Sequence, residues 1–378
     1  MNIEPWVLIP LKDLKFEDDE YDYDRVKNVK YDDGPNDFEE WYELVKQKIP
    51  HVEKIDCGGN MLTSLPVIDV GYLNCSFNLL KYLECGNIEI LNCRNNILEE
   101  LYANSVEKII CSDNPLKKLE ANNAKKIRCD FCELEELCLP EVIKLECDNN
   151  RITKIKAPKA IRVICDRNFI ETIECPLVEK LLIQSNKLTS LKFDYVKYID
   201  CSHNELISLD VPMADHVICN NNKLTHINSP NTEEIYCYNN ELTKIDFPNA
   251  EIVYCECNKI ESVNLPKVQK IICYRNKIKN LELPVAVEID IYGNDLESIK
   301  CYGEHVKVHC SEAKLEEIDI PNLKTIQLQN IPMIFNCKNE NAKIKLYIND
   351  KSSLFTNDEF QEKVRKKNQN LKCKRARN

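Results

Sequence analysis

Apolar and polar residues alternate along most of this chain in a pattern that repeats every 18 residues. Its clearest mark is a column of cysteines with two isoleucines among them. The column consists of Cys57, Cys75, Cys93, Cys111, Cys129, Cys147, Cys165, Ile183, Cys201, Cys219, Cys237, Cys255, Cys273 and Ile291, and after one inserted residue it continues with Cys310 and Leu328. A fixed period of this length predicts a stack of similar structural units.

Other positions align on the cysteine column. Two residues before it stands Ile, Leu or Val. From Cys57 to Ile291, Asn stands three residues after it in every repeat but one, where Cys132 takes its place. Leu, Ile or Val follows at five and eight residues after the column, and Pro is frequent at eleven. The alternation Ile-x-Cys predicts a short strand with two inward side chains. Each buried asparagine is expected to bond the backbone of its own turn and of the adjacent turn.

The repeat unit resembles the leucine-rich repeat core L-x-x-L-x-L-x-x-N-x-L, with cysteine in the third hydrophobic position. The resemblance covers residues 52–331 and recurs about fifteen times. Because the family's usual repeats run to ~20–29 residues, the unit looks most similar to short-repeat members such as secreted bacterial effectors. Its Asn-, Lys- and Ile-rich composition also resembles leucine-rich repeat proteins of large amoebal DNA viruses. A hexapeptide β-helix, the competing fold, requires an apolar residue at every sixth position, whereas the inward positions here step by three and two residues.

The resemblance implies a mostly-β solenoid with short parallel strands on its concave face. About seven residues remain after the asparagine turn, too few for a helix, and proline there favours an extended or polyproline-like convex side and weak curvature. Residues 1–50 are predicted to form an acidic N-terminal cap, residues 51–336 the repeat array, and residues 337–378 a C-terminal cap with a basic tail. Within the first cap, residues 36–49 predict an amphipathic helix that covers the first turn with Phe38, Trp41, Tyr42 and Val45.

Composition and charge argue against several classes of function and location. The formal net charge of −11 disfavours general nucleic-acid affinity, and no glycine-rich phosphate-binding motif is present. The N-terminus lacks the features of a secretory signal, and no run of 18 apolar residues predicts a membrane span. A reducing, cytoplasmic location with 21 free thiols is therefore expected.

The stretch CDFCELEELC, at 129–138, contains a Cys-x-x-Cys spacing that suits zinc or a redox pair. The repeat supplies a simpler interpretation, because Cys129 belongs to the inward column and Cys132 occupies an asparagine position. We therefore expect buried packing positions, with no metal and no cofactor. The thiols expected to be accessible are Cys138, Cys257 and Cys373.

The concave face is the expected binding surface, since repeat proteins bind with it. A cationic column recurs three residues before the cysteine column in five consecutive repeats, and Asp130, Asp148 and Asp166 lie alongside it. Farther along, tyrosines gather on the same face with an arginine near them, and these residue types anchor protein interfaces. The candidate partner-binding residues are Lys108, Lys126, Lys144, Arg162, Lys180, Tyr236, Tyr238, Tyr254, Tyr274, Arg275 and Tyr292. The alternative explanations are a solvated charged face and simple β-propensity.

The C-terminal run carries eight basic residues from Lys363 to Arg377. A solvated, disordered terminus is favoured over a nuclear-import or nucleic-acid element. Enzymatic activity is disfavoured, since no triad pattern is present and the segment after the array is too short for a catalytic domain. The sequence thus predicts a non-enzymatic scaffold, monomeric by default, that binds a protein partner. A nuclear or nucleic-acid-associated binder that uses the basic tail and the cationic column is the alternative.

Overall fold

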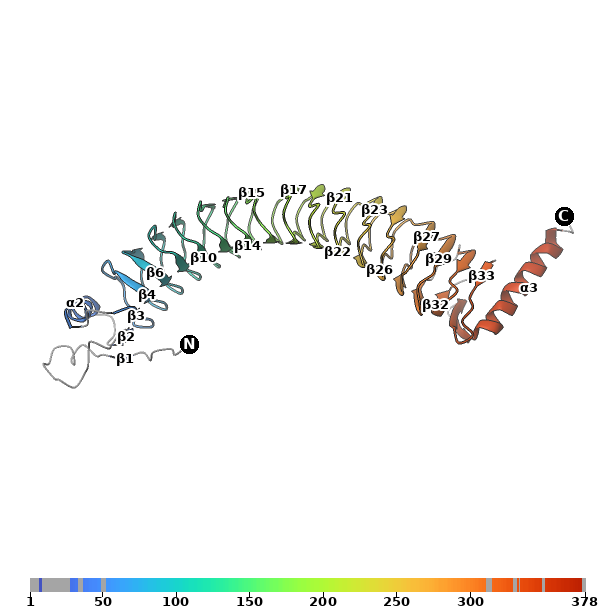
Figure 1. The fold of residues 1–378 in the computed structure, drawn as a ribbon, viewed down its shortest axis with the longest axis horizontal. Helices are drawn as coiled ribbons and strands as arrows, with labels where there is room; N and C mark the ends of the chain where they lie inside the picture. Colours follow the sequence, from blue (N-terminus) through green and yellow to red (C-terminus); the bar gives the residue numbers. More distant parts are fainter. Residues whose placement is uncertain are drawn as a thin grey trace. The chain divides into compact units, whose positions relative to one another are not determined.

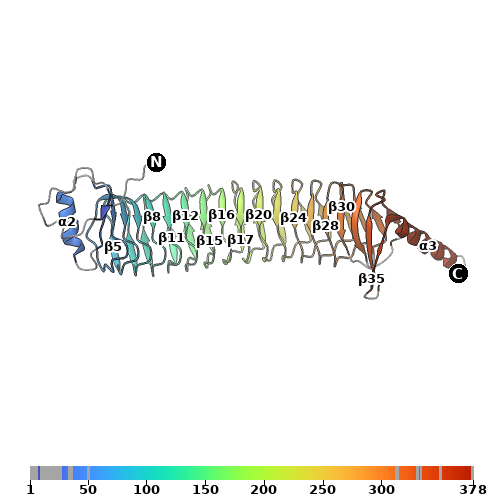
Figure 2. The ribbon, with the colours of Figure 1, turned by 90° about the horizontal axis from the view of Figure 1, so that it is seen from below.

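The structure is a computed structural model that describes residues 7–8, 28–32, 37–48, 52–310, 315–328, 332, 334–348 and 351–375. It divides into two compact units, Met1–Leu188 and Thr189–Asn378. Each unit is a stack of parallel turns (Figures 1 and 2), with front strands along one side and back strands along the other. The mostly-β solenoid predicted from the repeat is confirmed.

Most of the front strands carry the alternation of an apolar residue, an outward residue and Cys. In the first unit they are β1 (Val7–Leu8), β2 (Asn28–Lys30), β3 (Lys54–Asp56), β4 (Val70–Asn74), β6 (Ile88–Asn92), β8 (Lys108–Ile110), β10 (Lys126–Arg128), β12 (Lys144–Glu146), β14 (Arg162–Ile164) and β16 (Lys180–Leu182). In the second unit they are β18 (Tyr198–Asp200), β20 (His216–Ile218), β22 (Glu234–Tyr236), β24 (Ile252–Tyr254), β26 (Lys270–Ile272), β28 (Glu288–Asp290), β30 (Val306–His309), β32 (Leu323–Leu328) and β34 (Lys343–Ile348), with β35 (Lys351–Phe355) pairing antiparallel at the end.

Within the repeat array, the front strands pair in parallel at an offset of one repeat. Lys126 of β10 lies opposite Lys144 of β12, 18 residues on, and Glu288 lies opposite Lys307, 19 residues on. The second offset contains the inserted residue that the sequence indicates. Strict register places each sequence column in one line across the sheet.

The return path is extended, as expected, and it also pairs into short back strands that the sequence analysis did not predict. They are β5 (Tyr82–Glu84), β7 (Glu100–Tyr102), β9 (Lys118–Glu120), β11 (Glu136–Cys138), β13 (Lys154–Lys156) and β15 (Thr172–Glu174) in the first unit. In the second unit they are β17 (Ser190–Lys192), β19 (Ser208–Asp210), β21 (His226–Asn228), β23 (Lys244–Asp246), β25 (Ser262–Asn264), β27 (Asn280–Leu283), β29 (Ser298–Cys301), β31 (Glu317–Asp319) and β33 (Ile334–Asn336). The apolar residue eight positions after the cysteine column is the central, inward residue of each typical back strand, as Leu137 is in β11.

The asparagine ladder forms as predicted. Asn240 is representative: its Nδ2 donates to the carbonyl oxygens of Cys219, Cys237 and Tyr238 at 3.0, 3.1 and 3.2 Å. Its Oδ1 accepts the backbone N–H of Leu224 at 2.9 Å. One side chain thus bonds four backbone groups of its own turn and the preceding turn.

A left-handed residue precedes each ladder position, two residues after the cysteine column. The non-glycine members have φ between 53° and 58° and comprise Phe77, Asn95, Asp113, Phe131, Asn149, Arg167, Ser185, His203, Asn221, Asn239, Cys257 and Arg275. Gly59 and Gly293 hold the same place with φ of 77° and 71°. Such a conformation costs a non-glycine residue roughly 1–2 kcal/mol, and the ladder bonds that it makes reachable offset this cost.

Both ends of the described array carry a helix. The expected helix over 36–49 is confirmed as α2 (Phe38–Lys48), whose Trp41 and Val45 are fully buried. The aromatic ring of Tyr31, which follows β2, meets the rings of Phe38 and Trp41 with both centroid distances at 5.2 Å. This aromatic cluster gives the first turn an apolar cover.

The C-terminal run was expected to be disordered, and this is wrong for residues 363–375, which belong to helix α3 (Asn357–Arg375). Thr356 and Glu359 form a capping box: the N–H of Thr356 donates to Glu359 Oε2 at 2.9 Å, and the N–H of Glu359 donates to Thr356 Oγ1 at 3.4 Å. The helix packs through the fully buried Phe360, and its Asn357 Nδ2 donates to the carbonyl oxygen of Cys337. Residues 376–378 lie outside the described residues.

Candidate functional site

The front face of each unit presents three columns of outward side chains, three residues before, one before and one after the cysteine column. We call them the first, second and third front columns. Alternation along the strand turns their side chains away from the core, and parallel pairing repeats each column about every 4.8 Å. The candidate residues other than Arg275 all lie in these columns.

The cationic residues form the first front column of β8 to β16. Their Cα atoms are paired in register, Lys108 with Lys126, Lys126 with Lys144, Lys144 with Arg162, and Arg162 with Lys180. Within the described part of the chain, Lys108, Lys126, Lys144 and Arg162 take part in no ion pair. Like charges on neighbouring strands repel one another and lower the stability of a sheet. The same charges make this column a surface that attracts anions.

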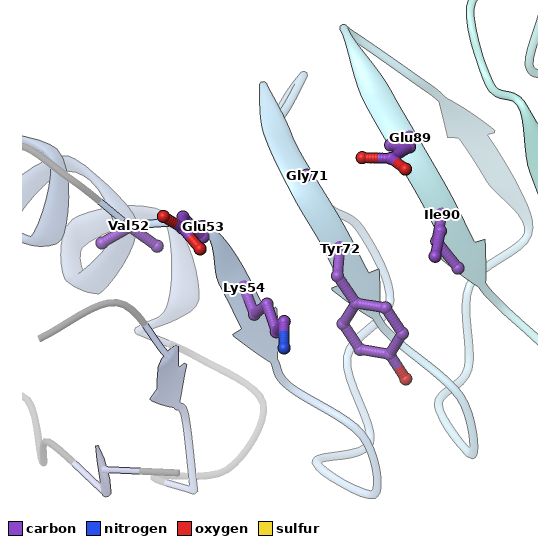
Figure 3. A pocket seen from close by; sticks show the side chains of 7 residues that line it. All are labelled: Val52, Glu53, Lys54, Gly71, Tyr72, Glu89 and Ile90. Atoms are coloured by element: carbon purple, nitrogen blue, oxygen red, sulfur yellow. The ribbon is translucent and has the colours of Figure 1, made fainter. Parts of the chain in front are cut away.

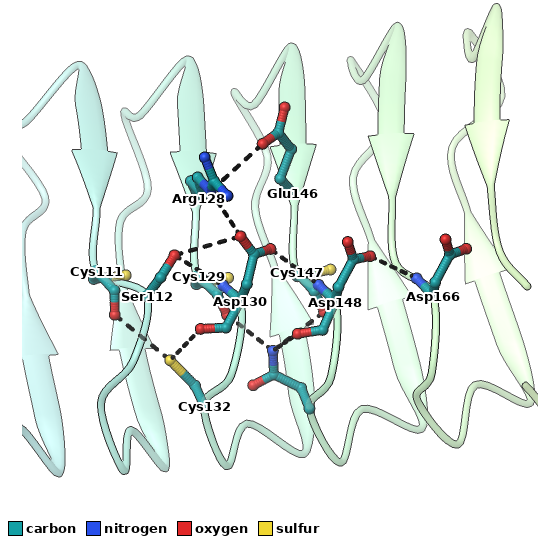
Figure 4. A network of polar contacts seen from close by, with 11 residues as sticks. Cys111, Ser112, Arg128, Cys129, Asp130, Cys132, Glu146, Cys147, Asp148 and Asp166 are labelled. Carbon is teal, nitrogen blue, oxygen red and sulfur yellow. Dashed lines mark hydrogen bonds and ion pairs between the residues drawn. The ribbon is translucent and has the colours of Figure 1, made fainter. Parts of the chain in front are cut away.

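The acidic residues alongside bond backbone N–H groups along their own column. In the third front column, Asp130 and Asp148 accept the backbone N–H of the next third-column residue at 3.2 and 2.7 Å (Figure 4). Asp166 accepts that of Gln184 at 2.7 Å. The cation that pairs with Asp130 is Arg128 of the second column, at 2.7 Å. The carboxylates therefore form a ladder of their own, tied to backbone amides.

Asp148 lies in the middle of this ladder. Its burial, together with the charges of Asp166, Asp130 and Glu146, raises its pKa to about 6. Because the pKa in the unfolded chain is ~3.9, the folded state binds more protons between these values. Stability is therefore expected to fall as pH rises from about 4 to about 6, where Asp148 ionises in the folded state.

Replacing Asp148 with asparagine should consequently stabilise the protein at pH 7. The amide oxygen still accepts the N–H of Asp166, while the buried negative charge disappears. The expected gain is about 1 kcal/mol after discounting for solvent screening of this half-buried group. Urea unfolding at pH 7 and at pH 4 measures it, and the gain should vanish at pH 4. A less stable variant at pH 7 would contradict this interpretation.

The candidate tyrosines gather on the front face of the second unit. Tyr236 and Tyr254, in the second column, stack with ring centroids 4.7 Å apart and planes 9° apart. Tyr274 and Tyr292, in the third column, stack at 4.6 Å and 9°. Tyr238 shares the third column, and all five rings are half-buried. The structure thus brings together the tyrosines that the sequence assigned to one surface.

Polar neighbours fix the second-column pair. Tyr236 donates its hydroxyl to Glu234 Oε1 at 2.6 Å, and His216 Nδ1 lies 3.3 Å from Glu234 Oε2. This hydrogen bond to Glu234, followed by burial, raises the pKa of Tyr236. The Lys270 ammonium lies 5.5 Å from the ring centroid of Tyr254. The rings are therefore held in place before any partner arrives.

Arg275 lies beside this surface rather than on a strand. It occupies the left-handed position after the cysteine column, at φ 55°, and its side chain is exposed. The sequence analysis missed Glu256, which stands in the third column between Tyr238 and Tyr274. Its only sequence signal is that an acid interrupts a run of tyrosines.

The cysteines of the repeat column lie at buried packing positions, as the sequence predicts. The thirteen column cysteines are buried, every described cysteine is a free thiol, and Cys138 is exposed on β11. Cys132 Sγ contacts the carbonyl oxygens of Cys111 and Asp130 at 3.5 and 3.7 Å, where an asparagine amide stands in other repeats. Burial raises the pKa of Cys132 to about 12, which keeps it as an unreactive thiol. Cys373 is in α3, and its side chain lies outside the described residues.

A depression lies on the front side at the start of the first unit (Figure 3), lined by Val52, Glu53, Lys54, Gly71, Tyr72, Glu89 and Ile90. It exists because Gly71 has no side chain at a position that Glu53 and Glu89 hold in the adjacent turns. A Cβ on Gly71 would lie 3.0 Å from the carbonyl oxygen of Glu53. In the ranges that the structure describes, no group of three or more His, Cys, Asp or Glu residues is arranged to hold a metal ion.

Comparison with known proteins gives similarity of structure only. The sequence matches no protein-family model and no curated protein. Among solved structures, YopM from Yersinia enterocolitica WA-314 is similar at 18% identity and a TM-score of 0.40, covering 74% of this chain and 88% of that chain. The leucine-rich repeat protein LIC12759 of Leptospira interrogans is similar at 14% identity and a TM-score of 0.46, covering 86% and 94%. Neither α2 nor α3, the helices of the described residues, has the length and apolar composition needed to cross a bilayer.

Proposed function

We infer that this chain, a leucine-rich repeat protein built from 18-residue turns, functions by binding a protein partner on the front face of its second unit. The observation that carries the inference is the clustering of five half-buried tyrosines in two adjacent columns, with two pairs stacked at 4.6–4.7 Å. The function is binding rather than catalysis, and it requires no cofactor.

Tyrosine suits a protein interface for physical reasons. It offers a large apolar ring with a polar tip and loses little conformational entropy, so interface hot spots are enriched in it. Here the strand register and the bond from Tyr236 to Glu234 hold the rings in place, which lowers the ordering cost of association. A stacked aromatic surface of this kind is suited to an extended or flat protein segment.

A second candidate function is binding of an anionic partner, nucleic acid included, at the cationic column of the first unit. Lys108, Lys126, Lys144 and Arg162 lie in register without ion pairs among the described residues, so their charges are available. The net charge of −11 opposes general nucleic-acid affinity. If nucleic acid were the partner, affinity would fall steeply with salt concentration and with removal of residues 363–378.

Affinity capture tests the main proposal. The intact chain and a Tyr236→Ala, Tyr254→Ala, Tyr274→Ala variant are immobilised and exposed to a cell extract. Each truncated hot-spot residue costs roughly 2 kcal/mol, so the triple variant should lose the partners that the intact chain retains.

A matched control removes three tyrosines from other surfaces. Tyr82 and Tyr102 lie on the back strands β5 and β7, and Tyr195 lies in the turn before β18. The corresponding triple alanine variant should keep the partners. Equal recovery by both variants would show that the tyrosine surface is not the binding site.

A further inference from the structure

Glu256 has an unusual environment for a carboxylate on a strand face. It stands one residue after Cys255, in the third front column, where Tyr238 precedes it by one repeat and Tyr274 follows it by one repeat. Its Oε2 atom is buried and has no hydrogen-bond partner. A buried carboxylate oxygen without a donor carries an uncompensated desolvation cost.

The electrostatic surroundings relieve that cost only in part. Burial raises the pKa of Glu256, a hydrogen bond from its own backbone N–H lowers it, and the charge of Asp290 raises it, so that the pKa lies above its ordinary value. Its own charge contributes to the raised pKa values of Tyr238 and Tyr274, after the larger effect of burial, so the three side chains lie close together. Glu256 takes part in no ion pair with another described residue.

Cations elsewhere on this face are already engaged or lie at its edge. Lys270 Nζ lies 3.6 Å from a Glu288 oxygen and over the ring of Tyr254. His309 Nδ1 lies 3.1 Å from Asp290 Oδ1. Arg275 is exposed beside Tyr274, and its charge acts on that tyrosine. Among the described residues no cation is paired with Glu256, so this part of the face offers a carboxylate oxygen and aromatic rings to a donor from outside.

We propose that Glu256, between Tyr238 and Tyr274, is a binding site for an arginine side chain carried by the protein partner. The carboxylate accepts hydrogen bonds from the guanidinium, and the rings of the two tyrosines contact its planar faces. The residue as a whole is half-buried while its Oε2 is buried, so the proposed contact requires the Glu256 side chain to rotate towards the guanidinium. This site rests on the proposed function, since the arginine belongs to the partner that the tyrosine surface binds.

Arginine fits the site better than lysine or an acidic group. Its planar guanidinium stacks on aromatic rings and pairs with a carboxylate through two parallel N–H donors. Lysine offers a compact charge with no planar face, and an acidic side chain would be repelled by Glu256 and Asp290. The partner chemistry is therefore an extended segment that presents arginine.

The test uses two synthetic ten-residue peptides, one of alternating arginine and serine and one in which citrulline replaces every arginine. Citrulline keeps the shape and removes the charge. Fluorescence anisotropy at 0.15 M salt is expected to show about tenfold tighter binding of the arginine peptide, as for one charge-assisted contact. Glu256→Gln should reduce the affinity for the arginine peptide to that for the citrulline peptide and leave the latter unchanged.

The matched control is Glu288→Gln, which makes the same charge change on the same face but at the residue paired with Lys270. It should reduce binding of the arginine peptide less than twofold. Equal affinity for the two peptides, an unaffected Glu256→Gln variant, or equal losses in both variants would overturn the proposal. If the tyrosine variant loses captured partners while Glu256→Gln keeps them, the arginine site is wrong and the proposed function stands.

Discussion

Replacing Asn240 with alanine is expected to lower the free energy of unfolding by about 4 kcal/mol. The change removes four hydrogen bonds, three donated to backbone carbonyls and one accepted from the N–H of Leu224. The residue is 8% exposed, so water reaches the freed groups poorly. The carbonyl oxygens of Cys219 and Cys237 keep a second donor, the side-chain amides of Asn222 and Asn258, so of these groups the N–H of Leu224 is left without a partner. Each lost hydrogen bond lowers the free energy of unfolding by about 1 kcal/mol, which gives about 4 kcal/mol for the four.

Urea unfolding measures the loss in the free energy of unfolding. Hydrogen exchange at the backbone amide of Leu224, which loses its acceptor, should become faster in the variant. The matched control is the adjacent Asn239→Gly. Asn239 is exposed and has φ 53°, and its side-chain amide donates to Asn221 Oδ1. Glycine keeps the backbone conformation and the backbone hydrogen bonds, so the change in stability should be less than about 1 kcal/mol. Similar losses in the two variants would show that the ladder is not what joins the turns.

Gly303→Ala is expected to lower the free energy of unfolding by about 3 kcal/mol or more, because the Cβ of the alanine has no room there. A Cβ built on Gly303 would lie 2.1 Å from the carbonyl oxygen of Ala286 and 2.8 Å from that of Val285. Both contacts are with backbone, which cannot rotate away as a side chain would. The preceding turn must therefore shift, and its hydrogen bonds must lengthen.

Thermal unfolding of Gly303→Ala is compared with that of Gly293→Ala. Gly293 has φ 71°, and the atoms nearest to its Cβ position lie at 3.4 Å or beyond, so alanine there is strained but not crowded. Its cost should be roughly 1–2 kcal/mol, smaller than that at Gly303. The reverse order would contradict the packing of these turns.

The period of the cysteine column was enough to predict the strands, their register and the asparagine ladder. Each of these follows from which side chains must be buried, and burial repeats with the sequence. The Cys-x-x-Cys spacing at Cys129 and Cys132 could be interpreted in the same way, since one is a strand position and the other a ladder position.

Other features have no repeating apolar signal. The left-handed column is filled by residues as different as Phe131, Arg167 and Ser185, because the turn geometry there is imposed by neighbouring turns and not by the residue. The back strands contribute one inward residue each, too few for a period-two pattern. The Thr356–Glu359 capping box is a sequence signal for the start of helix α3. The basic composition of the segment favoured disorder instead, and the prediction followed the composition.

The candidate surface was predictable in part. Columns of the repeat placed Tyr236, Tyr254, Tyr274 and Tyr292 on one face, but ring stacking depends on side-chain rotation that no column specifies. That Glu256 Oε2 has no hydrogen-bond donor could not be predicted for the same reason, since it depends on how the side chains around this one oxygen atom are oriented.

The central claim is that the front face of the second unit contacts a protein partner, and site-specific photo-cross-linking tests it most directly. One protein carries p-benzoylphenylalanine at Tyr254, on β24, and another carries it at Tyr195, an exposed residue outside the front strands. The account predicts that irradiation in a cell extract yields a discrete protein adduct from position 254 and none from position 195. The same adduct from both positions, or an adduct from position 195 alone, would contradict it.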